Sequence, residues 1–120
     1  MLEHLRQRVA NAFAKFDHVI LATCGPSGPQ ASRVRCRAQD ITLILSIPRS
    51  SDHLFNLEHQ KAVVVLTPEW QLQGTVQIVS AEQPAGESVT SAWNTEIEIQ
   101  PVRLQFLREG DLAFTETIDF

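Results

Sequence analysis

The chain has 120 residues, of which 43% are hydrophobic and 20% are charged, and its formal net charge at pH 7 is −4. These values indicate one globular domain over residues 1–120, and the negative charge argues against general affinity for nucleic acid. The apolar runs are far shorter than the roughly 20 residues that span a bilayer, and charged residues interrupt the N-terminal segment throughout. We therefore expect no membrane segment and no signal peptide, and a cytoplasmic location.

The elements can be taken in chain order from the spacing of apolar residues. Apolar residues at three-to-four spacing predict an amphipathic helix over residues 2–16. A second, short helix is expected at 51–58, and residues 82–94 are expected to form a loop with at most one helical turn. Two-residue alternation and β-branched runs predict strands at residues 18–24, 31–38, 41–47, 62–67, 70–81, 96–107 and 114–120.

The connections between these strands are mostly two to six residues long. Parallel strands need long crossover connections, usually helices, so a parallel sheet does not fit. We predict a mainly β fold, an antiparallel split barrel of six or seven strands with an N-terminal helix and one short helix. Pro101 is expected to mark a bulge or a sheet edge.

The positive charge of the chain is concentrated in one region. Residues 31–49 hold four arginines and a single acid, whereas residues 81–120 hold eight acids and two arginines. Arg33, Arg35 and Arg37 alternate with apolar residues and so share one face of a strand. The alternative is that these arginines only face solvent or pair with acids.

A phosphate site is the best-supported site in the sequence. Ser50 or Ser51 can begin the short helix, whose first amides are unpaired and lie at the positive end of its dipole. Arginine supplies a planar pair of donors to a phosphate. We therefore expect Arg33, Arg49, Ser50 and Ser51 to bind a phosphate.

The sequence contains few signs of a metal site, a catalytic side chain or a reactive cysteine. The four histidines form no metal-ligand spacing, so no metal site is expected, and no catalytic acid, base or nucleophile can be named. Cys24 and Cys36 are expected to be unpaired thiols: the predicted hairpin sets Cys24 near Ala31 and Cys36 near Val19, too far apart to bridge. The alternative for Cys36 is a reactive thiol activated by the arginines beside it.

The order of segments resembles the flavin-binding split β-barrel of the pyridoxamine 5′-phosphate oxidase-like family. HVILATCGPSGPQASRVRC is similar to that family's first hairpin, and ITLILSIPRSSDHLFNLEHQKAVVVLT to its strand, phosphate turn, Asn-Leu helix and strand. WQLQGTVQIVS is similar to its strand with a central glycine. The resemblance implies bound FMN and a homodimer, with a small-molecule substrate or electron acceptor as the other partner.

The resemblance also implies positions for the cofactor. It places the phosphate of FMN at Arg33 and the Ser50–Ser51 turn, with Arg35 or Arg49 compensating for a missing lysine. It places the ring near Val34, Ser46 and Ile47, and it implies that Trp70, Gln71 and Gln73 reach over from a second subunit. The chain has Asp52-His53 where the family usually has a basic pair. If His53 takes the lysine's place at the phosphate, FMN affinity should rise as the pH falls from about 8 to 6.

Two functions from different classes stay open. The first is an FMN-dependent oxidoreductase acting on a small molecule, in which the flavin carries the redox chemistry. The second is a non-catalytic split-barrel module that binds flavin or another ligand, or no cofactor, and acts through its dimer surface. The sequence does not name the substrate, the electron donor or the pathway.

Overall fold

The computed structural model describes residues 2–78, 93–107 and 114–120, which form two helices and seven strands. The predicted loop at 82–94 lies, except for its last two residues, outside the described residues. No helix among the described residues is long and apolar enough to cross a membrane. The elements are α1 (Glu3–Ala14), β1 (His18–Thr23), β2 (Gln30–Gln39), β3 (Thr42–Pro48), α2 (Asp52–His59), β4 (Ala62–Leu66), β5 (Trp70–Ile78), β6 (Asn94–Leu107) and β7 (Phe114–Asp119).

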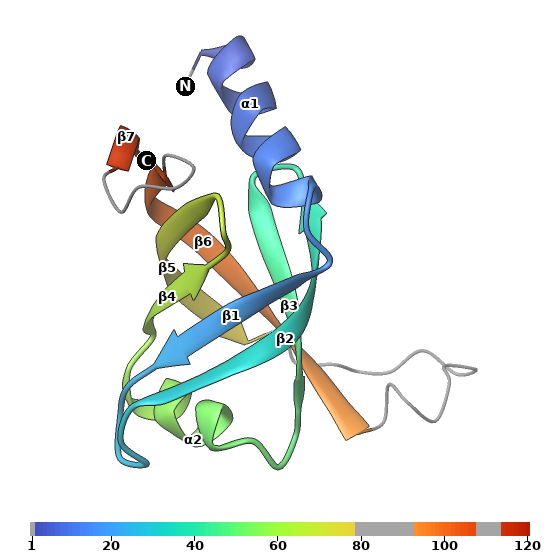
Figure 1. Ribbon diagram of the computed structural model, residues 1–120. Coiled ribbons are helices and arrows are strands. Elements are labelled where there is room, and N and C mark those ends of the chain that lie inside the picture. Colours follow the sequence, from blue (N-terminus) through green and yellow to red (C-terminus); the bar gives the residue numbers. More distant parts are fainter. Residues whose placement is uncertain (1, 79–92, 108–113) are drawn as a thin grey trace, which may run out of the picture.

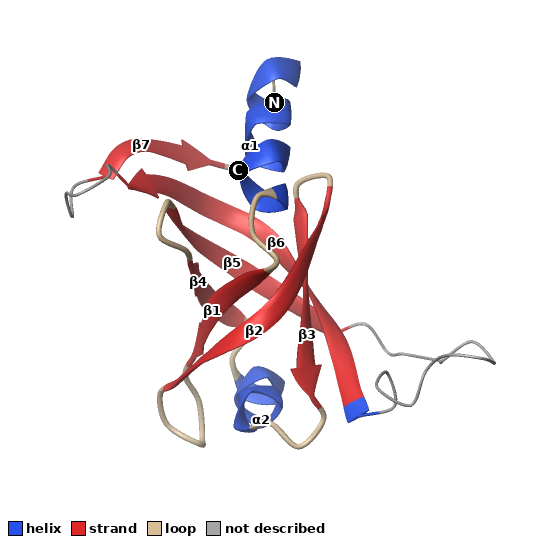
Figure 2. Cartoon of the chain, turned by 45° about the vertical axis from the view of Figure 1, so that its right-hand side comes forward, coloured by secondary structure: helices blue, strands red, loops and turns tan. Residues whose placement is uncertain are grey.

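All strand pairings are antiparallel, in the order β3-β2-β1-β4-β5-β6-β7. An additional pairing of β3 with β6 closes the first six strands into a barrel, and β7 pairs with β6 outside that ring. The predicted mainly β antiparallel barrel is therefore confirmed. The helices lie at opposite ends of the barrel, α1 at the upper end and α2 at the lower end (Figures 1 and 2).

The barrel core follows directly from the two-residue period of the strands. On β2, Val34 and Cys36 are buried, whereas Arg33, Arg35 and Arg37, which alternate with them, are exposed. On β3, Leu43, Leu45 and Ile47 are fully buried. The side chains from all the strands meet in one apolar cluster, to which α1 adds Val9 and Phe13 and α2 adds Leu57.

A register irregularity marks the middle of the β5–β6 pair. Gly74 faces Pro101 while Gln73 faces Arg103, so Val102 has no partner in the ladder. A Cβ atom at Gly74 would lie 2.4 Å from a side-chain carbon of Ile99, which is why this close approach needs glycine. The expected bulge at Pro101 is confirmed.

The first hairpin differs from the prediction by two residues. Val19 pairs with Val34 and Ala22 with Ala31, where the sequence suggested partners two residues further along. The loop keeps six residues but spans 24–29, between Thr23 and Gln30, and its tight turn at 25–28 is closed by a hydrogen bond from the amide of Gly28 to the carbonyl of Gly25 (2.8 Å). Both cysteines are unpaired, as expected.

Candidate functional site

The arginines of β2 lie together on the outer surface of the barrel. Arg33, Arg35 and Arg37 are all exposed, as the alternation predicted. Arg37 pairs with Glu96 of β6, with 3.3 Å between its guanidinium nitrogen and the carboxylate oxygen. Arg33 and Arg35 form no ion pair or hydrogen bond with another described side chain. Two cations are therefore available at this surface for an external anion.

The strand register identifies the neighbours of these two arginines. Arg35 lies opposite His18 of β1 on one side and Ser46 of β3 on the other. Arg33 lies opposite Ile20 of β1, which is 36% exposed. The structure thus brings Arg33, Arg35 and Ser46 onto one outer surface, where the predicted site needs them.

The turn before α2 presents polar groups as expected. Arg49 and Ser50 are exposed, and Ser51 begins the helix: its hydroxyl accepts a hydrogen bond from the amide of His53 at 3.1 Å. The guanidinium of Arg49 points toward β6, where its Nε lies 3.4 Å from the carbonyl oxygen of Asn94. Ser51 is therefore occupied as a helix cap, and Ser50 is the hydroxyl residue of this turn that extends into solvent.

His53 lies inside the lower end of the barrel and not at the outer surface. Its side chain is 2% exposed, with Nδ1 2.7 Å from the hydroxyl of Thr23 and Nε2 2.6 Å from the hydroxyl of Ser32. Because both ring nitrogens have partners within the protein, the imidazole offers no nitrogen to a ligand outside the barrel.

Three of the predicted ring contacts also face inward. Val34 and Ile47 belong to the apolar core and are 6% and 0% exposed, so their side chains do not reach a ligand at the outer surface. Trp70 is 1% exposed, and its ring packs against Phe13 and Phe16 with centroids 5.2 and 6.5 Å away. The indole ring therefore lies beneath α1 and away from the arginines.

Gln71 and Gln73 lie on the outer face of β5. The register sets Arg33, Ile20, Leu66 and Gln71 in one row across β2, β1, β4 and β5. Three strand spacings separate the ends of this row, so Arg33 and Gln71 of one chain are about 14 Å apart. A ligand group held by Arg33 can touch Gln71 only if it is long or if the glutamine comes from a second copy.

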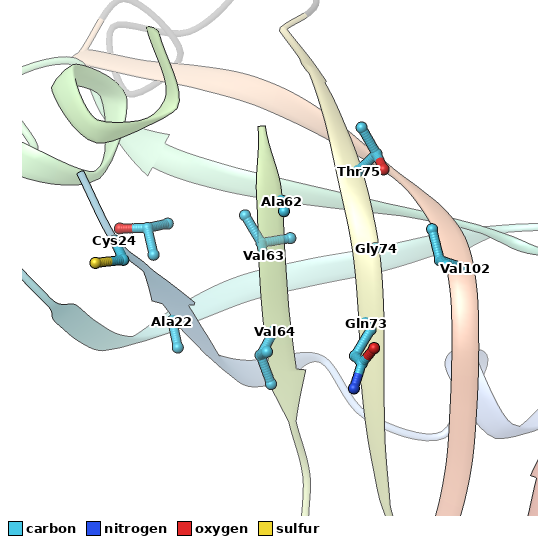
Figure 3. Close-up of a pocket in the computed structure, with 10 residues that line it drawn as sticks. Ala22, Cys24, Ala62, Val63, Val64, Gln73, Gly74, Thr75 and Val102 are labelled. Atoms are coloured by element: carbon cyan, nitrogen blue, oxygen red, sulfur yellow. The ribbon is translucent and has the colours of Figure 1, made fainter. Parts of the chain in front are cut away.

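A pocket of about 530 Å³ opens on the outer face beside this row (Figure 3). Its walls come from four strands and from the residue that follows β1, and they are mostly apolar, with Gln73 and Thr75 as polar side chains. The lining residues are Ala22, Thr23, Cys24, Ala62, Val63, Val64, Gln73, Gly74, Thr75 and Val102. Its volume and apolar character are those of a small-molecule site.

The pocket and the arginines are adjacent. Ile20 lies opposite Arg33, and Ala22, two residues further along the same face of β1, lines the pocket. Arg33 and Ala22 are thus diagonal neighbours, about 7–8 Å apart between Cα atoms. The outer surface therefore joins a cationic region to an apolar one, which suits a ligand with an anionic end and a flat apolar part.

Sequence reasoning missed most of this pocket and the buried polar residues Thr23 and Asn56. The pocket is made by small residues, including Ala22 and Ala62, that become neighbours only through the β1–β4 and β4–β5 pairings. Asn56 is 0% exposed, and nothing in its sequence context distinguishes it from a surface residue. Thr23 is 5% exposed, and the signal for its burial was its position, which continues the inward-facing alternation of Val19 and Leu21.

The buried thiol of Cys36 is not activated by the arginines beside it. Its side chain faces the interior, where Sγ lies 3.2 Å from the carbonyl oxygen of Phe16. Burial and the charge of Asp17 raise the pKa of Cys36 to about 11. The alternative of a reactive Cys36 is therefore wrong. Among the described residues, no three histidine, cysteine or acidic side chains are grouped to hold a metal ion.

Comparison with known proteins shows the class of fold. No family model and no curated protein matches the sequence. Among solved structures, a protein from Clostridium acetobutylicum related to general stress protein 26, of the pyridoxinephosphate oxidase family, has a TM-score of 0.73 and 14% identity, covering 99% of this chain and 96% of its own. General stress protein 26 from Bacillus anthracis has a TM-score of 0.68 and 16% identity, with 92% and 97% covered.

An F420 reductase is also similar, with a TM-score of 0.62 and 19% identity over 78% of this chain and 94% of its own. The chain therefore has the split-barrel fold of the pyridoxamine 5′-phosphate oxidase-like proteins, as the sequence resemblance implied. At these identities the likeness establishes the fold and not the chemistry.

Proposed function

We propose that the protein binds FMN on the outer surface of the barrel and is an FMN-dependent oxidoreductase acting on a small molecule. The observation that carries the proposal is the pair of exposed arginines, Arg33 and Arg35, which have no ion-pair or hydrogen-bond partner among the described side chains and lie beside an apolar pocket. Solved structures with the same fold include an F420 reductase and a member of the pyridoxinephosphate oxidase family, and flavin is a common ligand of this fold.

In this proposal the chain's own residues bind and orient the cofactor. Arg33 and Arg35 hold the phosphate through charge-assisted hydrogen bonds, and the Arg49–Ser50 turn adds donors. The apolar walls around Ala22 and Ala62 take the flat ring and exclude water from it. FMN, when bound, supplies the redox chemistry that the protein side chains lack.

We also propose that the protein acts as a homodimer. Ile20 and Val102, 36% and 49% exposed, lie on the same outer face as the pocket, and a second copy would cover them. Such a partner can bring Gln71 and Gln73 toward a cofactor whose phosphate is held by the other chain. Light scattering at micromolar concentration should give twice the chain mass of 13.4 kDa. A mass of 13.4 kDa contradicts the dimer.

The binding experiment is absorption spectroscopy. The purified protein, or the protein mixed with FMN and passed through a desalting column, should carry a flavin band. A protein that stays colourless in both cases overturns FMN binding. To test catalysis, bleaching of bound FMN by reduced nicotinamide nucleotides is compared with bleaching of free FMN.

The second candidate is the non-catalytic module, and one observation favours it. The phosphate turn carries an exposed acid, Asp52, while the neighbouring His53 is turned inward, so the turn has fewer positive groups than a phosphate site usually has. Equal bleaching rates for bound and free FMN, from every donor tested, favour this candidate over the enzyme.

A further inference from the structure

A buried polar cluster fastens α2 to the first hairpin. Asn56 is fully buried: its Oδ1 accepts from the amide of Ser27 (2.9 Å), and its Nδ2 donates to the carbonyl of Gly28 (2.9 Å) and to the hydroxyl of Thr23 (3.2 Å). His53 continues the chain of contacts from Thr23 to Ser32. The cluster lies at the lower end of the barrel, where α2 meets β1 and β2 (Figure 2).

These contacts favour one position for the proton of His53. The amide of Ser27 sets the orientation of Asn56, so the hydroxyl of Thr23 accepts a hydrogen bond from Asn56. The Thr23 hydroxyl can then donate its own hydrogen to Nδ1 of His53, which leaves Nε2–H to donate to Ser32. Every donor and acceptor of the cluster is satisfied with a neutral imidazole.

A second proton on His53 would disturb this arrangement. Both ring nitrogens would then be donors, and the hydroxyl of Thr23 would have to turn its hydrogen away from Nδ1. Burial lowers the pKa of His53, and the charge of the neighbouring Asp52 opposes that shift. The groups facing the ring from β1 and β2 are the hydroxyls of Thr23 and Ser32, neither of which titrates.

The contact to Ser32 has a particular place in the proposed anion site. Ser32 directly precedes Arg33, and His53 lies two residues after Ser51, which begins α2. Among the described residues, the Ser32–His53 hydrogen bond is the only side-chain hydrogen bond between β2 and α2. It therefore links the strand that presents the arginines to the helix whose preceding turn presents Arg49 and Ser50.

We propose that His53 is a positioning residue for this anion site: its neutral imidazole, bonded to Ser32 and Thr23, holds Arg33 and the turn before α2 at a fixed separation. This inference rests on the proposed FMN function. It differs from the expectation from the sequence, in which His53 itself would contact the phosphate, because here the imidazole acts only through its hydrogen bonds to Ser32 and Thr23.

The test compares FMN with riboflavin, which lacks the phosphate, in the wild type, Ser32→Ala and Ser32→Thr at about pH 8. Ser32 is exposed, so both variants should fold. At pH 8, Ser32→Ala should weaken FMN binding about three- to tenfold and leave riboflavin unchanged, because one hydrogen bond is lost. Ser32→Thr keeps the hydroxyl and should bind FMN like the wild type.

An alanine variant that binds FMN as tightly as the wild type, or that loses FMN and riboflavin affinity equally, overturns the proposal.

Nuclear magnetic resonance of the imidazole gives a readout without flavin. We expect the Nε2–H tautomer and a midpoint below about 6.5, and a histidine in the other tautomer or titrating above that value overturns the proposed arrangement. A wild type that binds neither FMN nor riboflavin contradicts the proposed function, and His53 then has no phosphate site to position. The tautomer and the titration midpoint of the imidazole still show whether His53 is hydrogen-bonded to Thr23 and Ser32 as proposed.

Discussion

The indole Nε1 of Trp70 donates a hydrogen bond to the carbonyl oxygen of Ala12, 3.2 Å away. Helix α1 ends at Ala14, so the carbonyl of Ala12 is one of the last four, which have no partner within the helix. Trp70, the first residue of β5, thus secures the end of α1 against the barrel.

Trp70→Phe should therefore destabilise the protein by about 1–3 kcal/mol, since the carbonyl loses its donor and the core loses volume. Urea unfolding measures the change, and Trp93→Phe is the matched control, because Trp93 is 72% exposed and its replacement should cost less than about 0.5 kcal/mol. FMN affinity should not change with Trp70→Phe. A stable Trp70 variant with weakened flavin binding would show that the ring contacts the cofactor.

His53→Lys distinguishes the buried histidine from a phosphate ligand. A lysine is charged at pH 8, and at this position its ammonium would be buried between the hydroxyls of Thr23 and Ser32. We expect a loss of stability on the order of 2–4 kcal/mol. His59→Lys, an exposed change on the same helix, should cost less than about 0.5 kcal/mol. A His53→Lys protein of unchanged stability and tighter FMN binding would restore the phosphate contact expected from the sequence.

The stability of the protein should also depend on pH through His53. The pKa of His53 is lowered in the folded state, so the unfolded chain, with a pKa near 6.5, binds the proton more readily. The stabilising effect of the neutral ring is complete above about pH 6.5 and is lost as the pH falls toward the folded-state pKa. Urea unfolding at pH 7.5 and 5.5 should show this loss, and His53→Gln should reduce it. If the free energy of unfolding falls as much in His53→Gln as in the wild type between pH 7.5 and 5.5, other groups cause the loss.

The two cysteines should differ sharply in reactivity. Cys24 is exposed, whereas Cys36 is buried with a pKa of about 11, so only about one Cys36 in a thousand is a thiolate at pH 8. A disulfide reagent should label one thiol quickly in the native protein and the second only on unfolding. Cys24→Ser should remove the fast phase, and Cys36→Ala should keep it. A fast phase that survives in Cys24→Ser would mean that Cys36 is accessible.

The strand elements were predictable because their pattern is local. Arg33, Arg35 and Arg37 alternate with Val34 and Cys36, and a strand places alternate residues on opposite faces whatever it pairs with. The start of the short helix was also predictable from local residues: the sequence offered Ser50 or Ser51 as its cap, and the hydroxyl of Ser51 is the one that caps it.

The inward orientation of His53 was not predictable, because it depends on how α2 packs beneath the hairpin. Thr23 and Ser32, its two partners, are 30 and 21 residues away in the chain. The burial of Trp70 depends likewise on α1, more than 50 residues earlier. The pocket needs strands β1, β4, β5 and β6 side by side, and only the closed sheet brings Ala22 near Gln73.

The central claim is that Arg33 holds the phosphate of FMN while the neighbouring pocket holds its ring. Titration of flavin fluorescence with FMN and riboflavin, in the wild type, Arg33→Ala, Arg37→Ala and Ala62→Trp, tests both parts at once. Arg37 is the matched control, since it lies on the same face of β2 but is paired with Glu96. Ala62 is an exposed residue of the pocket wall, so a tryptophan there fills the pocket.

The account predicts that Arg33→Ala weakens FMN binding roughly 10- to 100-fold, the value of a charge-assisted hydrogen bond, with riboflavin barely changed. Arg37→Ala should leave both flavins unchanged, and Ala62→Trp should weaken both alike. Equal losses of FMN and riboflavin in Arg33→Ala, or an FMN affinity that Arg33→Ala does not alter, would contradict the claim.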